Sequence, residues 1–202
     1  MTHWFKLYSL GLIVTVVGLA IGVHAQAGMY KGYETTPYAV MASDGAVELR
    51  RYAPHIVAEI DVEGSREQAI RRGFRALAAS VSGANETRDT VEMIVPVSQF
   101  AESDGWTIRF IMPAVYGIGI WPKLASPASD AIRFVEIPTE DQLVLRFKGI
   151  PTAQKLAEKS DELAAYARSK GFSSIGEPRF HFYDDPFTLP WKRRNEVSLQ
   201  VS

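Results

Sequence analysis

The chain contains one pattern of secondary structure twice, and this repeat limits the folds open to it. In each copy, two stretches of alternating apolar and polar residues end at a glycine, a helix-like stretch follows, and two more alternating stretches come after it. The two glycines, Gly64 and Gly149, lie about 85 positions apart. The pattern predicts an α+β protein of about eight mostly antiparallel strands and two main helices, with pseudo-twofold symmetry.

The first copy covers residues 38–113. A turn at residues 43–45 precedes a strand over residues 47–52, and residues 55–63 form the next strand, with apolar side chains on one face and mostly polar ones on the other. A capping box of Ser65 and Gln68 opens the helix. The helix carries one apolar stripe, formed by Ile70, Phe74, Leu77 and Val81. Two further strands are predicted, over residues 91–97 and 106–112.

The second copy covers residues 130–201 and repeats this order. Strands are predicted over residues 132–137 and 143–147, and Pro151 opens a helix that Gly171 closes. The inner stripe of this helix is Ala153, Leu156, Ser160, Leu163 and Ala167. The last two strands are predicted over residues 179–183 and 196–201. Residues 38–201 therefore form one domain made of two repeats.

The first 25 residues have the pattern of a secretory signal peptide. A short basic start leads into an apolar stretch, residues 7–23, and small residues follow at Ala25 and Ala27. We expect cleavage after Ala25 or Ala27, which predicts an exported protein, periplasmic or secreted if the source is bacterial. The alternative is an uncleaved membrane anchor, although a spanning helix needs roughly 20 apolar residues.

Composition excludes several classes of function. The chain has no Cys, which rules out disulfides, thiolate metal sites, covalent c-type haem attachment and Cys nucleophiles. Lys and Arg total 22 against 23 Asp and Glu, and this balance argues against a nucleic-acid-binding protein. No nucleophile elbow, phosphate-binding loop, HExxH or dinucleotide fingerprint is present. We therefore expect a binding protein and not an enzyme.

Two histidines are weak candidates for metal ligation. His55 lies on the polar face of its strand beside Glu59 and Asp61, so we expect it to face solvent. His181 alternates with phenylalanines, and we expect it to be structural or exposed.

Seven short motifs occur in order along the chain and resemble the SOUL / haem-binding protein family. The resemblance extends over about residues 38–201, and its motifs are VELRRY (47–52), GFRALAASVSGANE (73–86), MIVPV (93–97), FIMP (110–113), FKG (147–149), YDDP (183–186) and RRNEV (193–197). The resemblance implies a distorted antiparallel barrel of two repeats with two helices, which agrees with the repeat above. Two positions depart from the family pattern: Arg51 stands where some relatives carry a candidate iron-ligating histidine, and Ile94 replaces a threonine.

The resemblance also implies a function and a site. It implies non-covalent binding of haem or another tetrapyrrole beside the first helix, in a carrier or buffer. Its apolar wall maps onto Ile70, Phe74 and Leu77, with Arg71 at its edge. Trp191, Lys192 and Arg193 would form a rim near the propionates.

Two other functions are alternatives on the same fold. A small-molecule hydrolase would need an acid or tyrosine inside a groove, and Glu92 and Tyr183 are the candidates. A partner-docking module would instead expose an apolar patch of several hundred Å² without an enclosed pocket.

Overall fold

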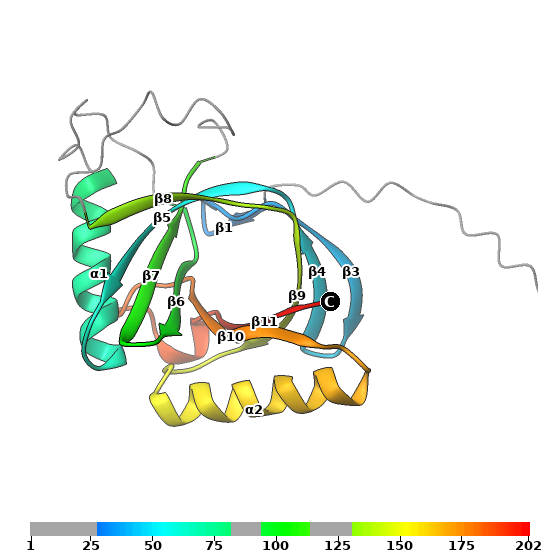
Figure 1. The fold of residues 1–202 in the computed structure, drawn as a ribbon. Coiled ribbons are helices and arrows are strands. Elements are labelled where there is room, and N and C mark those ends of the chain that lie inside the picture. Colours follow the sequence, from blue (N-terminus) through cyan, green and yellow to red (C-terminus); the bar gives the residue numbers. More distant parts are fainter. Residues whose placement is uncertain (1–27, 82–93, 114–130) are drawn as a thin grey trace, which may run out of the picture.

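The computed structural model describes residues 28–81, 94–113 and 131–202, which form one strongly curved sheet with two helices on its outside (Figure 1). In chain order the elements are β1 (Met29–Tyr30), β2 (Tyr33–Glu34), β3 (Tyr38–Asp44), β4 (Val47–Tyr52), β5 (His55–Val62), α1 (Arg66–Val81), β6 (Val97–Glu102), β7 (Gly105–Ile111), β8 (Ile132–Ile137), β9 (Glu140–Phe147), α2 (Ala153–Ser169), β10 (Ser174–Phe182), the 3₁₀ turn η3 (Pro190–Lys192) and β11 (Asn195–Val201).

Nine strands pair antiparallel in the order β3-β4-β9-β11-β10-β6-β7-β5-β8. The centre lies between β6 and β10: β7, β5 and β8 follow on one side, and β11, β9 and β4 on the other. Each strand of the first repeat except β3 thus has a counterpart in the second, which confirms the predicted α+β fold and its pseudo-symmetry. Within the described residues no ladder joins β3 to β8, so the barrel is open.

The apolar face of the sheet points outward and is covered by the helices. Below α2, Leu156 and Leu163 are fully buried, and this core is completed by Val47, Leu143, Leu145, Phe147, Ala167, Val197, Leu199 and Val201. Below α1, a second core contains Ile56, Ala58, Ala69, Leu77, Val97, Ile108, Phe110, Met112 and Ile132. Each helix therefore packs mainly on strands of its own repeat, and the other repeat adds one buried residue to each core, Val47 below α2 and Ile132 below α1.

The two repeat glycines, Gly64 and Gly149, adopt the same unusual backbone conformation at the end of a strand. Gly64 and Gly149 follow β5 and β9 and have φ of +103° and +108°, a region that side chains with a Cβ rarely adopt. In the second half the chain then passes Pro151, and the Thr152 hydroxyl accepts a hydrogen bond from the Lys155 amide, which starts α2. The predicted start of this helix is confirmed.

Helix α1 is rotated relative to the predicted stripe. Its inward face is Ala69, Gly73 and Leu77, whereas Ile70 is half-buried and Phe74 is 38% exposed. The reason is close packing on β7, because a Cβ on Gly73 would lie 2.4 Å from Cγ1 of Ile108. Phe74 therefore lies at the helix edge, with its ring 5.4 Å from that of Phe110. The side chain of Val81 lies outside the described residues.

One predicted strand needs correction, and one strand was not predicted. The strand expected over residues 91–97 begins only at Val97; Pro96 has no amide hydrogen to donate to a ladder, and Val95 makes only an isolated bridge to Thr35. Residues 91–93 lie outside the described residues. The stretch before the turn at residues 43–45 is strand β3, which pairs with β4.

Among the described residues, no helix is long and apolar enough to cross a membrane.

Candidate functional site

The inside of the barrel is mostly polar because the helices cover the more apolar face of the sheet, although a small apolar cluster with Val57 and Ile111 also lies inside. Alternate residues on the strands point inward, and they include Arg50, Tyr52, His55, Glu59, Ser98, Arg109, Glu140, Gln142, Arg179, His181, Glu196 and Ser198. The predicted division of β5 into two faces is right. Its polar face, however, faces the interior, so the expectation that His55 faces solvent is wrong: it lines a cavity and contacts the Ala53 carbonyl through Nδ1.

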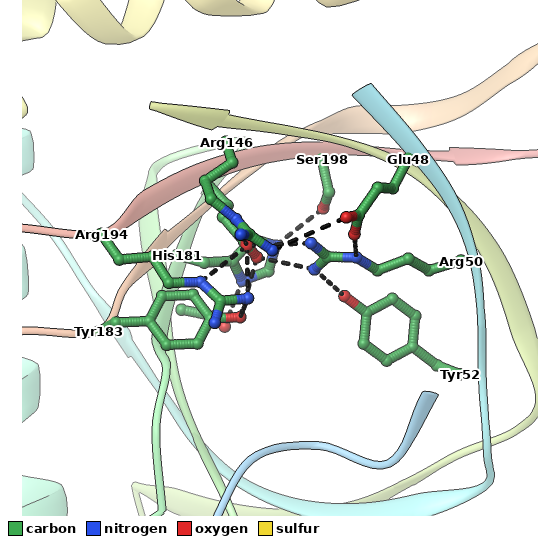
Figure 2. Close-up of polar contacts among 10 residues, drawn as sticks. Glu48, Arg50, Tyr52, Arg146, His181, Tyr183, Arg194 and Ser198 are labelled. Atoms are coloured by element: carbon green, nitrogen blue, oxygen red, sulfur yellow. Dashed lines mark hydrogen bonds and ion pairs between the residues drawn. The ribbon is translucent and has the colours of Figure 1, made fainter. Parts of the chain in front are cut away.

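Glu196 is the acceptor at the centre of a buried charge cluster. Figure 2 shows its donors Arg50, Tyr183 and Arg194. Its carboxylate accepts two hydrogen bonds from Arg50, at 2.9 and 3.0 Å, and further ones from Arg194 and from the Tyr183 hydroxyl. The side chains of Arg50 and Glu196 are each only 1% exposed. Burial raises the pKa of Glu196, but Arg50 and Arg194 more than offset this and hold that pKa at about 2. Glu196 is therefore a permanently charged acceptor at neutral pH.

This cluster explains two of the sequence motifs. Arg50 belongs to VELRRY and Glu196 to RRNEV, and the sheet brings them together although they are 146 positions apart. Arg50 also bonds Glu48 and the Tyr52 hydroxyl, and Arg146 lies 3.4 Å from Glu196. Sequence reasoning missed the pair. The available signal was a pair of charges of opposite sign, one on the polar face of each alternating strand, beside Glu48 in one and Ser198 in the other.

His181 lies beside the cluster with both ring nitrogens occupied. Nδ1 lies 2.8 Å from the Ser98 hydroxyl and Nε2 lies 2.8 Å from the Ser198 hydroxyl. Burial lowers the pKa of His181 to about 3, so the ring is neutral at physiological pH. In the described residues no cluster of three His, Cys, Asp or Glu side chains could hold a metal ion. His181 is therefore a buried structural residue, which is one of the two roles expected for it; the other was an exposed position.

A small cavity adjoins the cluster inside the barrel. Its volume is about 30 Å³, and its lining includes Tyr52, His55, Arg109, Glu140, Gln142, Arg179, His181 and Tyr183. Within the described residues the buried Oε1 of Gln142 has no hydrogen-bond partner, and a cavity of this size has room for a water there. A tetrapyrrole of about 40 heavy atoms needs far more space. This cavity, as the described residues form it, is too small for a tetrapyrrole.

The outer surface holds the residues predicted to contact a tetrapyrrole, and the structure separates them into two groups. On α1, Arg71 is exposed and Phe74 is partly exposed one turn away, but Leu77 is fully buried in the core. Leu77 cannot touch a surface ligand without opening that core. The helix therefore offers Phe74 and Arg71, with half-buried Ile70 beside them.

The second group lies on residues 184–191, here called the apolar loop, together with the residues that follow it. Trp191 is 63% exposed and Lys192 is exposed. Arg193 is half-buried, since its guanidinium donates to the carbonyls of Thr188 and Pro186 at 2.7 and 2.5 Å. Arg193 therefore holds the loop in shape, and its expected place near the propionates stays a prediction.

The apolar loop lies near the beginnings of both helices (Figure 1). The Arg66 guanidinium at the start of α1 donates to the Pro151 carbonyl just before α2, and the Gly149 amide donates to the Pro190 carbonyl. The two groups of predicted residues thus belong to neighbouring parts of one surface. No contact between Phe74 and Trp191 is present in the described residues.

Comparison with known proteins identifies the family. The model of the SOUL heme-binding protein family matches residues 33–200. The chain belongs to the SOUL heme-binding protein family. No curated protein sequence matches significantly.

Solved structures confirm the fold at low identity. The EcmrR C-terminal domain is similar with TM-score 0.57 and 12% identity, over 77% of this chain and 96% of that one. A hydrolase from Listeria innocua has TM-score 0.53 and 14% identity, over 80% and 94% of the two chains. EcmrR in a DNA complex has TM-score 0.58 and 13% identity, over 77% and 57%. Identities this low show a shared fold alone. The expectation that this SOUL family member does not bind nucleic acid therefore stays a prediction.

Proposed function

We propose that this protein binds haem or a related tetrapyrrole non-covalently on the outer surface beside α1, and that it acts as an exported carrier or buffer. The observation that carries the proposal is the family match over residues 33–200. The outer surface supplies a suitable chemistry, since Phe74 and Trp191 expose aromatic rings and Arg71 and Lys192 form no ion pair in the described part of the chain. A flat apolar ligand with two carboxylates matches both features.

The ligand can be held without coordination of its iron. Arg51, at the position of the candidate ligand in some relatives, forms a two-point ion pair with Asp141 at 2.7 and 2.8 Å. A ligand of about 40 heavy atoms at roughly 0.3 kcal/mol per atom has an affinity ceiling of about 12 kcal/mol. Burial of the porphyrin face therefore provides enough free energy for micromolar or tighter binding. Exposed cation–propionate pairs add about 0–1 kcal/mol each and orient the ligand.

The interior residues do not favour the hydrolase alternative. Tyr183 does line the cavity, but its hydroxyl donates to Glu196, and the Glu196 carboxylate is engaged by Arg50 and Arg194. A carboxylate with a pKa of about 2 is a weak base for activating water. Glu92 lies outside the described residues. The binding function is therefore the one that we favour.

Titration with hemin tests the proposal. We expect a saturable change in the Soret band of the folded protein. Lys192→Ala should weaken hemin binding by up to about fivefold at low salt, because one exposed propionate pair is lost. The effect should shrink as salt screens the pair, and a porphyrin esterified at both propionates should bind equally to both proteins.

Lys170→Ala is the matched control, because Lys170 is an exposed lysine at the far end of α2. It should leave hemin affinity unchanged. If Lys192→Ala binds hemin as tightly as the wild type at low salt, this lysine does not contact a propionate. If the folded wild type gives no saturable Soret change, the tetrapyrrole proposal itself is wrong.

A further inference from the structure

Four large apolar side chains are exposed around the apolar loop. Phe187 is 94% exposed, Trp191 63%, Ile150 56% and Leu189 46%. Ile150 joins the group because the backbone of its neighbour Gly149 is hydrogen bonded to Pro190. Single exposed apolar residues are ordinary, but a group of four on one surface marks an interaction site.

Hydrogen bonds hold these side chains in the exposed position. The Asp185 carboxylate accepts from the amides of Phe187 and Thr188, at 2.7 and 3.0 Å, and from the Thr188 hydroxyl. The Arg193 guanidinium closes the loop from the other side by donating to two of its carbonyls. Because the loop is ordered before any partner arrives, little conformational entropy is lost when its apolar side chains are buried.

The charge around these side chains is positive. Lys148 and Lys192 are exposed and form no ion pair within the described residues, and Arg193 keeps its charge while it bonds carbonyls. The N-terminal ends of α1 and α2, which carry partial positive charge, lie at the same edge because Arg66 reaches the Pro151 carbonyl. Asp185 is the exposed acid of the loop, and its oxygens are engaged by the loop itself.

The N-terminal part of the chain is attached at this place. Tyr30 and Lys31 both bond the Asp184 carboxylate, at 2.9 and 2.5 Å, three residues before Phe187. The apolar stretch over residues 7–23 precedes them directly in the sequence. A chain that keeps this stretch in a bilayer therefore enters the fold beside the apolar loop.

We propose that the apolar loop docks on the surface of an anionic lipid bilayer. Phe187, Leu189, Trp191 and Ile150 enter the boundary between head groups and acyl chains, and Lys148 and Lys192 lie at the level of the lipid phosphates. Aromatic and aliphatic side chains flanked by lysines have the chemistry of a peripheral membrane contact. This inference goes beyond tetrapyrrole binding and does not depend on it.

Quenching of Trp191 by lipid tests the proposal in the full-length chain. Trp4, Trp106 and Trp121 are replaced by Phe so that Trp191 is the only tryptophan. The protein is mixed with vesicles of phosphatidylcholine and phosphatidylglycerol whose acyl chains carry bromine. We expect strong quenching of Trp191 fluorescence on these vesicles, and quenching at least about threefold weaker on phosphatidylcholine alone, because each lysine near an anionic surface contributes to binding.

Phe187→Ser with Leu189→Ser should abolish the quenching, while circular dichroism stays that of the parent. Val40→Ser with Met41→Ser is the matched control, since these two apolar residues are exposed on the edge strand β3. The control should be quenched like the parent. Phe187→Ser alone is the fallback if the double variant does not fold.

Three results would overturn the proposal. One is an unquenched Trp191 on vesicles with which the protein sediments. Another is parental quenching in the folded Phe187 and Leu189 variant, and a third is equal loss in the Val40 and Met41 control. If the Phe187 and Leu189 variant binds hemin more weakly but shows the parental quenching by lipid, the loop belongs to the tetrapyrrole site. If hemin does not bind and the quenching pattern holds, only the proposed function fails.

Discussion

At the scale of single residues, the contact between Arg50 and Glu196 links the two repeats. Arg50 lies on β4 of the first repeat and Glu196 on β11 of the second, and both are almost fully buried. Two buried charges cost several kcal/mol in desolvation, which is offset only where the hydrogen bonding is complete. Here Arg194, Tyr183, Arg146 and Arg50 surround the carboxylate on both oxygens. The pair therefore depends on the whole cluster.

Removing the negative charge of this pair should destabilise the fold strongly. Glu196→Gln leaves the buried guanidinium of Arg50 without its counter-charge, and we expect a loss of about 3–5 kcal/mol in the free energy of unfolding. Urea denaturation at neutral pH measures it. Asp141→Asn removes the acid from the exposed pair with Arg51 and should cost at most about 1 kcal/mol. Equal losses in the two variants would contradict the central place of Glu196.

At the scale of elements, the two helices pack by different means. Helix α2 places leucines, Leu156 and Leu163, on its sheet. Helix α1 instead presents Ala69 and Gly73 beside Leu77, which lets it approach β7 closely. The close approach turns Phe74 and Arg71 toward the outer surface. A small residue in the core face of α1 thus allows the packing that leaves Phe74 partly exposed.

Adding one methyl group to this contact should cost stability. Gly73→Ala raises helix propensity by about 1 kcal/mol, but the new Cβ would lie 2.4 Å from Cγ1 of Ile108. We expect a net loss of about 1–3 kcal/mol, as in overpacked cores, measured by thermal or urea unfolding. Arg75→Ala on the exposed face of the same helix should change stability by less than about 0.5 kcal/mol. A Gly73→Ala protein more stable than the wild type would show that α1 has room to move away.

At the scale of the whole molecule, the barrel has its two larger hydrophobic cores outside and its buried charges inside, next to a smaller apolar cluster that contains Val57 and Ile111. Two apolar layers separate the helices from the sheet, while Arg50, Glu196, His181 and their neighbours fill the interior. The protonation of interior groups is therefore coupled to folding. Arg50, Arg109, Arg179 and Glu196 all act on His181, and burial keeps its pKa at about 3.

This arrangement predicts loss of stability in mild acid. The unfolded chain protonates His181 below about pH 6.5, but the folded protein does not until about pH 3. The unfolded state thus binds more protons in this window, so stability is full above pH 6.5 and falls toward pH 3, by up to roughly 4 kcal/mol. Glu196 adds to the loss between its unfolded pKa of 4.5 and about 2. Urea denaturation between pH 7 and 4 measures the slope.

His181→Asn is the control for this dependence. It should be less stable than the wild type at pH 7, because the bonds to Ser98 and Ser198 are altered. Its stability should nevertheless change less between pH 6.5 and 4.5, since the titrating ring is gone. His55, whose pKa burial also lowers, leaves a residual slope. An unchanged slope in His181→Asn would assign the acid sensitivity to other groups.

Much of the fold is readable in the sequence because it depends on local patterns. Alternation in residues 55–62 and 132–137 predicts strands β5 and β8, and the glycines Gly64 and Gly149 mark the ends of β5 and β9, where positive φ is needed. The repeat of these signals predicts the symmetric sheet. The residues predicted to contact a tetrapyrrole came from the family resemblance, and the structure places Arg71, Trp191 and Lys192 on the surface. Phe74 is also exposed there, because α1 is rotated relative to the predicted stripe.

The order of the elements and the two faces of each strand can be predicted from local patterns, because periodicity is a property of neighbouring residues. Which face lies inside depends on the curvature of the folded sheet. A strand with one apolar and one polar face has the same sequence pattern whether its polar face contacts water or the inside of a barrel. The pattern therefore predicts a solvent-facing His55, which is wrong, and it does not predict the pair of Arg50 and Glu196. Their meeting depends on the curvature of nine strands. The fit of Gly73 against Ile108 likewise depends on how closely a helix approaches a sheet, which no local pattern records.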